Sequence, residues 1–133
     1  MAASIPESHL DLLNRPLVAT LATILASGRP QVHPVWCSYS NGQVWVNSAK
    51  DRAKDKNMRE RRHATILVIE PDNPLRWVEI RGHAVEITEE GADEHISDMC
   101  ELYMGTRDYS FGASDEVRVL YKIEPNRVMV GTG

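Results

Sequence analysis

Short apolar runs, each closed by a turn signal, constrain the fold of this chain more than any other feature. Runs rich in β-branched and aliphatic residues are expected to form strands. They are residues 17–25, 31–40, 43–48, 64–70, 76–88, 117–123 and 127–130. Asn41-Gly42 joins two of them and predicts a tight hairpin, because both central positions of such a turn need positive φ. The last two runs are separated only by residues 124–126 and are expected to form another hairpin.

Helical periodicity is confined to a few segments that do not alternate regularly with the strands. A short helix is expected before Asn14-Arg15-Pro16, another in the basic segment after residue 49, and a third within residues 89–105. A parallel sheet would need a helical crossover between successive strands. We therefore predict a mainly β fold, a small antiparallel β-barrel of six to seven strands with peripheral helices.

Length and composition predict a single domain spanning residues 1–133. A chain with 42% hydrophobic and 26% charged residues has the composition of a globular protein. Its apolar runs fall short of the ~20 residues of a membrane span, and its N-terminus lacks the charged-then-apolar order of a signal peptide. Cys37 and Cys100 lie far apart, and the histidines lack the spacing of metal ligands. These features predict a cytoplasmic protein without a metal site.

The segment Lys50–Arg62 is a positive island on an acidic chain. It holds seven basic and three acidic residues, a net charge of +4, whereas the whole chain carries −4. One interpretation is a solvated helix with charge pairs one turn apart. The other is an anion clamp in which Arg52 and Lys54, just after a strand, converge on a phosphate. Asn47 and Ser48 at the strand end could then add neutral donors.

Two further residues have alternative interpretations. The strand tryptophans and tyrosines are explained by core packing, but Trp77 shares a strand face with Arg81. A planar ligand or a subunit interface would account for Trp77 better than the core. His33 lies beside Pro34, which removes a donor from its strand and indicates an edge, a bulge or a ligand there. His33 is either a proton donor or an ordinary polar strand residue.

These motifs resemble those of the split β-barrel flavin/deazaflavin oxidoreductases, the pyridoxamine 5'-phosphate oxidase-like superfamily. The resemblance extends from about Pro16 to Val130. Its most specific parts are Arg52-Ala53-Lys54, followed by Asn57 and Arg59, and the Arg-Trp-x-x-x-x-Gly pattern of residues 76–82. Within the superfamily, the chain is most similar to the branch that uses coenzyme F420. The FMN-using oxidases place further basic residues on the preceding hairpin strands, whereas residues 31–48 contain none.

The resemblance implies a cofactor site and a reaction. The implied cofactor-binding residues are Pro34, Val35, Trp36, Asn47, Ser48, Arg52, Lys54, Asn57 and Trp77. Arg52 and Lys54 would bind the phosphate, the backbone of residues 34–36 would line the ring system, and Trp77 would approach from the partner subunit of a homodimer. The implied reaction is hydride transfer from reduced F420 to a small unsaturated or conjugated substrate. The proton would come from solvent, His33 or Arg76.

Two other functions remain open at this point. The same fold could serve an FMN-binding oxidoreductase or a flavin-binding protein. A small barrel could instead bind nucleic acid through the basic helix and the strand aromatics. The acidic remainder of the chain argues against that second alternative.

Overall fold

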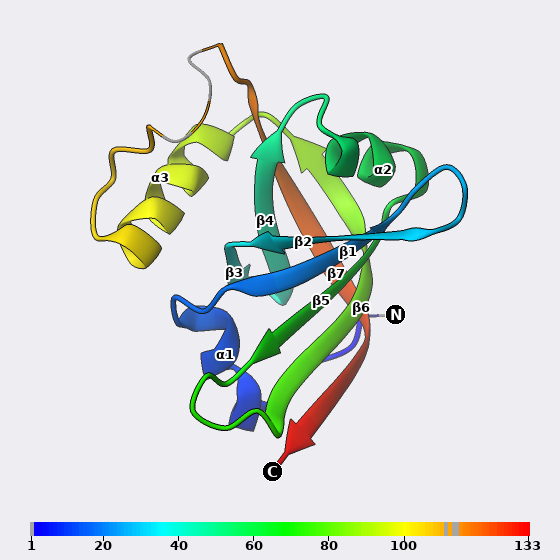
Figure 1. The fold of residues 1–133 in the computed structure, drawn as a ribbon, viewed down its shortest axis with the longest axis vertical. Coiled ribbons are helices and arrows are strands. Elements are labelled where there is room, and N and C mark those ends of the chain that lie inside the picture. Colours follow the sequence, from blue (N-terminus) through cyan, green and yellow to red (C-terminus); the bar gives the residue numbers. More distant parts are fainter. Residues whose placement is uncertain (1, 111, 113–114) are drawn as a thin grey trace.

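The computed structural model describes residues 2–110, 112 and 115–133 and shows a mainly β protein with peripheral helices (Figure 1). The short 3-10 helix η1 spans Glu7–His9. The α-helices are α1 (Asp11–Asn14), α2 (Ala53–Arg61) and α3 (Ala92–Met104). The strands are β1 (Ala19–Ile24), β2 (Pro30–Val35), β3 (Cys37–Ser40), β4 (Gln43–Ala49), β5 (His63–Ile69), β6 (Arg76–Thr88) and β7 (Arg118–Thr132).

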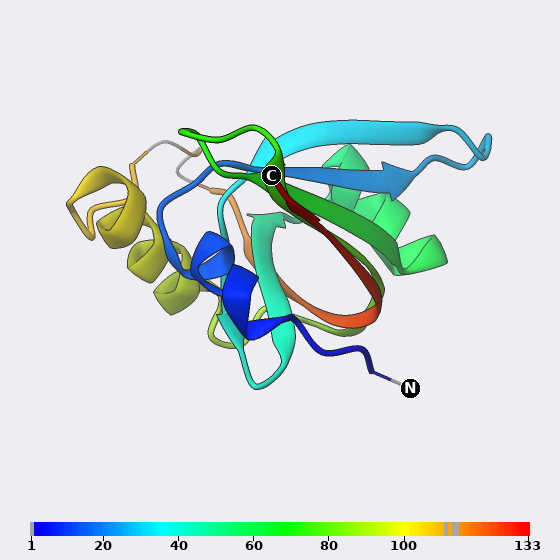
Figure 2. The ribbon, with the colours of Figure 1, turned by 90° about the horizontal axis from the view of Figure 1, so that it is seen from below.

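The seven strands form one antiparallel sheet that curls round on itself. Its order is β2-β1-β5-β6-β7-β4-β3, so β2 and β3 are the two ends of the sheet. These two strands are nevertheless consecutive in the chain and are separated only by Trp36. The sheet must therefore bend until its ends meet at that residue, which produces a split barrel (Figure 2). Helices α2 and α3 lie outside the ring on opposite sides.

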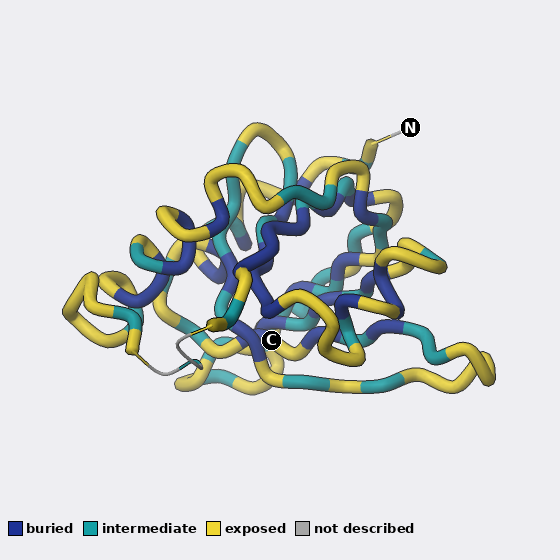
Figure 3. The backbone as a smooth tube through the Cα atoms, turned by 90° about the horizontal axis from the view of Figure 1, so that it is seen from above, coloured by how far each residue is buried: buried dark blue, intermediate teal, exposed yellow. Residues whose placement is uncertain are grey.

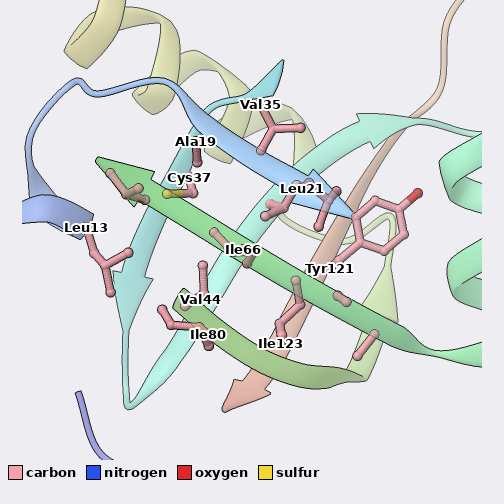
Figure 4. Close-up of a cluster of buried hydrophobic side chains, with 14 of the residues drawn as sticks. Leu13, Ala19, Leu21, Val35, Cys37, Val44, Ile66, Ile80, Tyr121 and Ile123 are labelled. Carbon is pink, nitrogen blue, oxygen red and sulfur yellow. The ribbon is translucent and has the colours of Figure 1, made fainter. Parts of the chain in front are cut away.

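The core fills the inside of this ring. In β5, the residues Ala64, Ile66 and Val68 are buried and alternate with more exposed neighbours, which is the period of two expected of a strand with one face inward. Figure 3 shows buried residues along the ring and exposed ones along the projecting β1–β2 turn. Side chains from all seven strands meet inside, among them Leu21, Val44, Ile66, Ile80 and Ile123 (Figure 4). The predicted fold class is confirmed.

Several local predictions are also confirmed. Asn41 and Gly42 have φ values of 52° and 76°, as the hairpin between β3 and β4 requires. The pairing of β6 with β7 shifts register between Arg81 and Gly82. A Cβ atom on Gly82 would lie 2.2 Å from the carbonyl oxygen of Glu124, so the close approach of the two strands requires glycine there.

Two strand boundaries differ from the sequence prediction. The run 31–40 divides at Trp36 into β2 and β3, because its halves pair with different strands, β1 and β4. The predicted hairpin at residues 124–126 is wrong, since β7 runs through them without turning back. Both halves of β7 pair with β6, and Pro125 lies opposite Gly82 at the register shift. The extra residue at this shift is Asn126 of β7, so the strand bulges there and does not reverse.

None of the helices in the described ranges 2–110, 112 and 115–133 is long and apolar enough to cross a membrane.

Candidate functional site

A cavity of about 370 Å³ lies beside the junction of the two sheet ends. Strands β2 and β4, the start of β7, the N-terminal end of α2 and the outer helix α3 all contribute to it. Its lining residues are Val18, Pro34, Val35, Trp36, Asn47, Ser48, Arg52, Lys54, Ile96, Met104, Tyr109 and Arg118. This volume lies within the range of small-molecule and cofactor sites.

An aromatic and aliphatic wall forms one part of the cavity. Trp36 stacks on Tyr103 of α3, with ring centroids 5.1 Å apart and an angle of 17° between the planes. Tyr109 meets Trp36 edge to face at 6.4 Å. The Tyr103 hydroxyl donates to the carbonyl of Leu17 at 2.8 Å and accepts from the amide of Cys37 at 3.3 Å. These contacts fix α3 against the barrel, so the wall is held in place.

Three cationic side chains of the described residues also line the cavity: Arg52, Lys54 and Arg118. They meet because β4 ends at Ala49, where it pairs with Arg118, and α2 begins immediately afterwards. Burial lowers the pKa of Lys54, and the positive charges of Arg52 and Arg118 lower it further. The cluster therefore repels itself, and a bound anion would relieve that repulsion.

Glu116 connects two of these cations. Its carboxylate accepts hydrogen bonds from Arg52 Nη2 and, at 2.6 Å, from Arg118 Nη1. Arg118 also donates from Nε to Asn47 Oδ1 at 2.8 Å, and its guanidinium lies 5.0 Å from the centre of the Tyr109 ring. Arg118 is therefore held on several sides and presents a fixed positive charge to the cavity.

Asn47 and Ser48 are both buried at the end of β4, but their hydrogen bonding differs. The Asn47 side chain accepts from Arg118 and donates to the carbonyl of Ala92 at 2.8 Å and to Nδ1 of His95 at 3.2 Å. Ser48 belongs to the cavity lining and is only 1% exposed, and its hydroxyl has no hydrogen-bond partner in the described part of the chain. An unpaired buried hydroxyl is costly, and a ligand acceptor in the cavity would satisfy it.

His95 forms a hydrogen bond with the Asn47 side chain. Burial lowers the pKa of His95 to about 4, so the ring is neutral at pH 7. Because the Asn47 amide donates to Nδ1, the ring proton lies on Nε2, which donates to Ser38 Oγ at 3.0 Å. A neutral histidine therefore orients Asn47, and Asn47 in turn orients Arg118.

The structure brings together most, though not all, of the predicted site residues. Pro34, Val35, Trp36, Asn47, Ser48, Arg52 and Lys54 line the same cavity. Asn57 does not belong to this lining, and its amide donates instead to Thr23 Oγ1 of β1 at 3.0 Å. Trp77 lies at the start of β6, and its indole packs against Gly131. Within one chain, Trp77 does not reach the cavity.

The two predicted sources of a proton have different surroundings. His33 is half-buried in β2, and its Nδ1 atom has no hydrogen-bond partner among the described residues. Burial lowers the pKa of His33, and the charge of Lys54 lowers it further. Arg76 instead donates to Asp11, to Glu70 and to the carbonyl of Ser8, and the hydrogen bond to Asp11 raises its pKa.

The basic segment divides between the two interpretations offered by its sequence. Arg52 and Lys54 line the cavity. The other basic residues contact neighbouring groups or solvent: Lys50 pairs with Glu89, Arg59 with Asp55, Arg61 with Glu60, Arg62 with the carbonyl of Ala84, and Lys56 is exposed. Most of the basic residues in the segment therefore form contacts around α2 or face solvent, and do not line the cavity.

Sequence reasoning missed Arg118, Glu116 and Tyr109. Arg118 begins the last strand, directly after a polar loop, and only its pairing with the end of β4 brings it to the cavity. A basic residue at a strand start beside a polar, aromatic-containing loop was the available signal. It gains meaning only when the strand order is known.

The chain also matches a known protein family. The family model described as pyridoxamine 5'-phosphate oxidase matches residues 5–130. The chain belongs to this family. A search of curated proteins gave no match.

Several solved structures are similar to this member of the pyridoxamine 5'-phosphate oxidase family. A protein named F420 reductase is 27% identical, with a TM-score of 0.84, and the match covers 94% of this chain and 98% of that one. A conserved hypothetical protein from Mycobacterium tuberculosis is 23% identical, with a TM-score of 0.78 and coverage of 98% and 86%. General Stress Protein 26 from Bacillus anthracis shares the fold at 12% identity, with a TM-score of 0.70 and coverage of 94% and 92%.

The cavity of this family member fits the phosphate of a flavin-like cofactor. Lys54, which lies near the positive charges of Arg52 and Arg118, and the unpaired Ser48 hydroxyl are groups that a phosphate would satisfy. The wall containing Trp36 and Tyr109 is suited to a planar ring. No group of three His, Cys, Asp or Glu side chains within the described ranges is placed to hold a metal ion.

Proposed function

We propose that this chain is an F420-dependent reductase that passes a hydride from reduced F420 to a small unsaturated or conjugated substrate. The observation that carries the proposal is one cavity that is lined by three cations, Arg52, Lys54 and Arg118, by aromatic rings, and by Ser48 with its unpaired buried hydroxyl. The similarity to the structure named F420 reductase, at 27% identity over nearly the whole chain, supports the choice of cofactor.

The residues have separate roles in this proposal. Arg52, Lys54 and Arg118 would hold the phosphate, with Ser48 as a neutral donor. The backbone of residues 34–36 and the Tyr109 ring would line the ring system and exclude water from it. When bound, the deazaflavin supplies the hydride, so the protein contributes position and electrostatics without a nucleophile.

His33 is the better supported of the two protein candidates for the proton donor. It lies next to Pro34 of the cavity wall and is close enough to Lys54 for that charge to lower its pKa. His33 would donate from its imidazolium form and become neutral, and its lowered pKa makes that form a stronger acid. The ion pairs of Arg76 with Asp11 and Glu70 strengthen its hold on its protons, which makes it a poor acid.

A homodimer with Trp77 supplied to the cofactor by the partner subunit stays part of the proposal. Trp77 does not line the cavity of its own chain, so this role requires a second copy. Val18 and Met104 line the cavity and are 60% and 55% exposed, and Val32 nearby on β2 is 59% exposed. Covering such apolar side chains would favour association. The cytoplasmic location stays a prediction.

FMN is the second candidate cofactor, because membership of the pyridoxamine 5'-phosphate oxidase family supports a flavin as well as a deazaflavin. FMN also has a tricyclic ring and a phosphate, joined by a short polyol chain, so the same contacts would hold it. An FMN-binding oxidoreductase or flavin-binding protein is then the function.

A fluorescence titration with F420 and FMN side by side tests these proposals. We expect F420 to bind at least tenfold more tightly than FMN, because its tail carries carboxylates beyond the phosphate and the cavity cluster is cationic. Protein that is yellow when purified and releases FMN on denaturation would replace the F420 assignment by the FMN one. Binding of neither compound would contradict both.

A further inference from the structure

The Glu116 carboxylate occupies both arginines of the cavity at once. One oxygen accepts from Arg52 and the other from Arg118. Its side chain is 8% exposed, and a Cβ atom on Gly112 would lie 2.1 Å from its Oε2 atom, so backbone covers it closely. Glu116 therefore satisfies these two guanidinium groups with a pair of anionic oxygens, as a phosphate would.

The two halves of this bridge differ in strength. Arg118 is 8% exposed and has Asn47 and Tyr109 as further contacts, so its pair with Glu116 is desolvated and held in place. The Arg52 side chain is 51% exposed, so solvent screens its pair with Glu116. The ion pair of Arg52 with Glu116 is therefore the weaker of the two, and a competing anion can replace Glu116 there at a small cost in free energy.

We propose that Glu116 is an intramolecular competitor of the acidic ligand for Arg52. It holds Arg52 at the rim of the cavity, an incoming phosphate takes Arg52 over, and Glu116 remains with Arg118. The inference rests on the proposed function, in which a cofactor phosphate binds in this cavity. Glu116 then lowers the affinity for every phosphate-bearing ligand and leaves neutral ring compounds unaffected. This residue sets how strongly the site discriminates by ligand charge.

The test replaces Glu116 by an isosteric neutral residue and compares charged with neutral probes. Glu116→Gln is expected to lower the dissociation constant for FMN about fivefold, the factor that corresponds to losing one partly exposed ion pair. Riboflavin, which has the same ring and no phosphate, should bind both proteins equally. If Glu116 instead orients the arginines for the ligand, the variant will bind FMN equally or more weakly, and the proposal is overturned.

A double-mutant cycle identifies which arginine exchanges Glu116 for the ligand. On an Arg52→Ala background, the gain from Glu116→Gln is expected to disappear, because no competition for Arg52 remains. A gain of the same size on that background would mean that Arg118 is the contested group, which contradicts the proposal. Glu116→Asp covers the case in which the glutamine variant does not fold. Its shorter side chain keeps a charge for Arg118 but cannot span both arginines, so it should also tighten FMN binding.

Inorganic phosphate separates this inference from the cofactor assignment. The thermal midpoint of unfolding of wild type and Glu116→Gln is measured with increasing phosphate, since a ligand that binds the folded state raises it. We expect half-saturation at a lower phosphate concentration in the variant. That result supports the competition even if neither F420 nor FMN binds. Equal or weaker phosphate binding by the variant overturns it, whatever the cofactor is.

Discussion

Replacing Arg52 and Lys54 together by alanine is expected to weaken the binding of F420 or FMN about 100-fold. Each of these side chains can give a charge-assisted hydrogen bond worth about 1.5–3 kcal/mol, and two such bonds at the low end correspond to that factor. The effect of Lys54 should exceed that of Arg52, because Lys54 is more buried and Arg52 must first leave Glu116. Fluorescence titration of each single variant and of the pair measures both contributions.

A matched control comes from the same segment. Lys50 and Lys56 are exposed and do not line the cavity. Lys50→Ala with Lys56→Ala therefore removes the same charge from the same part of the molecule, and it should change the affinity by less than about threefold through the long-range field alone. If both pairs of substitutions weaken binding equally, the positive island acts as a diffuse field, and the assignment of a specific phosphate clamp is wrong.

Asp55→Asn is expected to destabilise the fold by about 3 kcal/mol, equivalent to a fall of roughly 10 °C in the thermal midpoint. Asp55 is completely buried at the start of α2 and accepts hydrogen bonds from the Tyr121 hydroxyl, the amide of Asp51 and Nε of Arg59. An asparagine side chain keeps the shape but can accept at only one of its two ends. It would leave Arg59 without its carboxylate partner.

The destabilisation should depend on pH with a definite sign. Burial alone would raise the pKa of Asp55, but the hydrogen bonds from Tyr121, Asp51 and Arg59 together hold it below its ordinary value. A carboxyl whose pKa is lower in the folded state stabilises fully above its unfolded pKa and loses that contribution as the pH falls through the folded pKa. The difference between wild type and Asp55→Asn should therefore be largest at neutral pH and shrink below about pH 4.

Chemical denaturation at pH 7 and pH 3 measures this difference. Asp72→Asn, at an exposed turn position, is the matched control and should change the unfolding free energy by less than about 0.5 kcal/mol. If Asp55→Asn leaves stability unchanged at pH 7, the buried carboxylate does not hold α2 to β7, and the position of Arg52 and Lys54 depends on other contacts.

The strands could be predicted because their signals are local. Burial of Ala64, Ile66 and Val68 follows from alternation, and the Asn41-Gly42 turn follows from its two positive φ angles. The break at Trp36 and the continuity of β7 could not be predicted, because each depends on a pairing partner that is distant in sequence. The seven predicted strand runs match the seven observed strands in number only because one wrong split and one missed split compensate each other.

In the candidate site, too, some residues could be predicted from local sequence and others depend on strand pairing. Ser48, Arg52 and Lys54 lie beside one cavity because they follow one another closely in the chain, at the end of β4 and the start of α2. Arg118 reaches them through the register between β4 and β7, which no local pattern reveals. Trp77 lies outside the lining of its own chain's cavity, so its predicted role depends on a partner subunit.

The central claim is that the cations beside β4 hold the phosphate of a tricyclic redox cofactor. A crystal structure of the protein soaked with F420 or FMN tests it most directly. We expect the phosphate within hydrogen-bonding distance of Arg52, Lys54, Arg118 and the Ser48 hydroxyl, with the ring against the Trp36–Tyr109 wall. A cofactor phosphate bound elsewhere, with Arg52 and Lys54 directed into solvent, would contradict the claim.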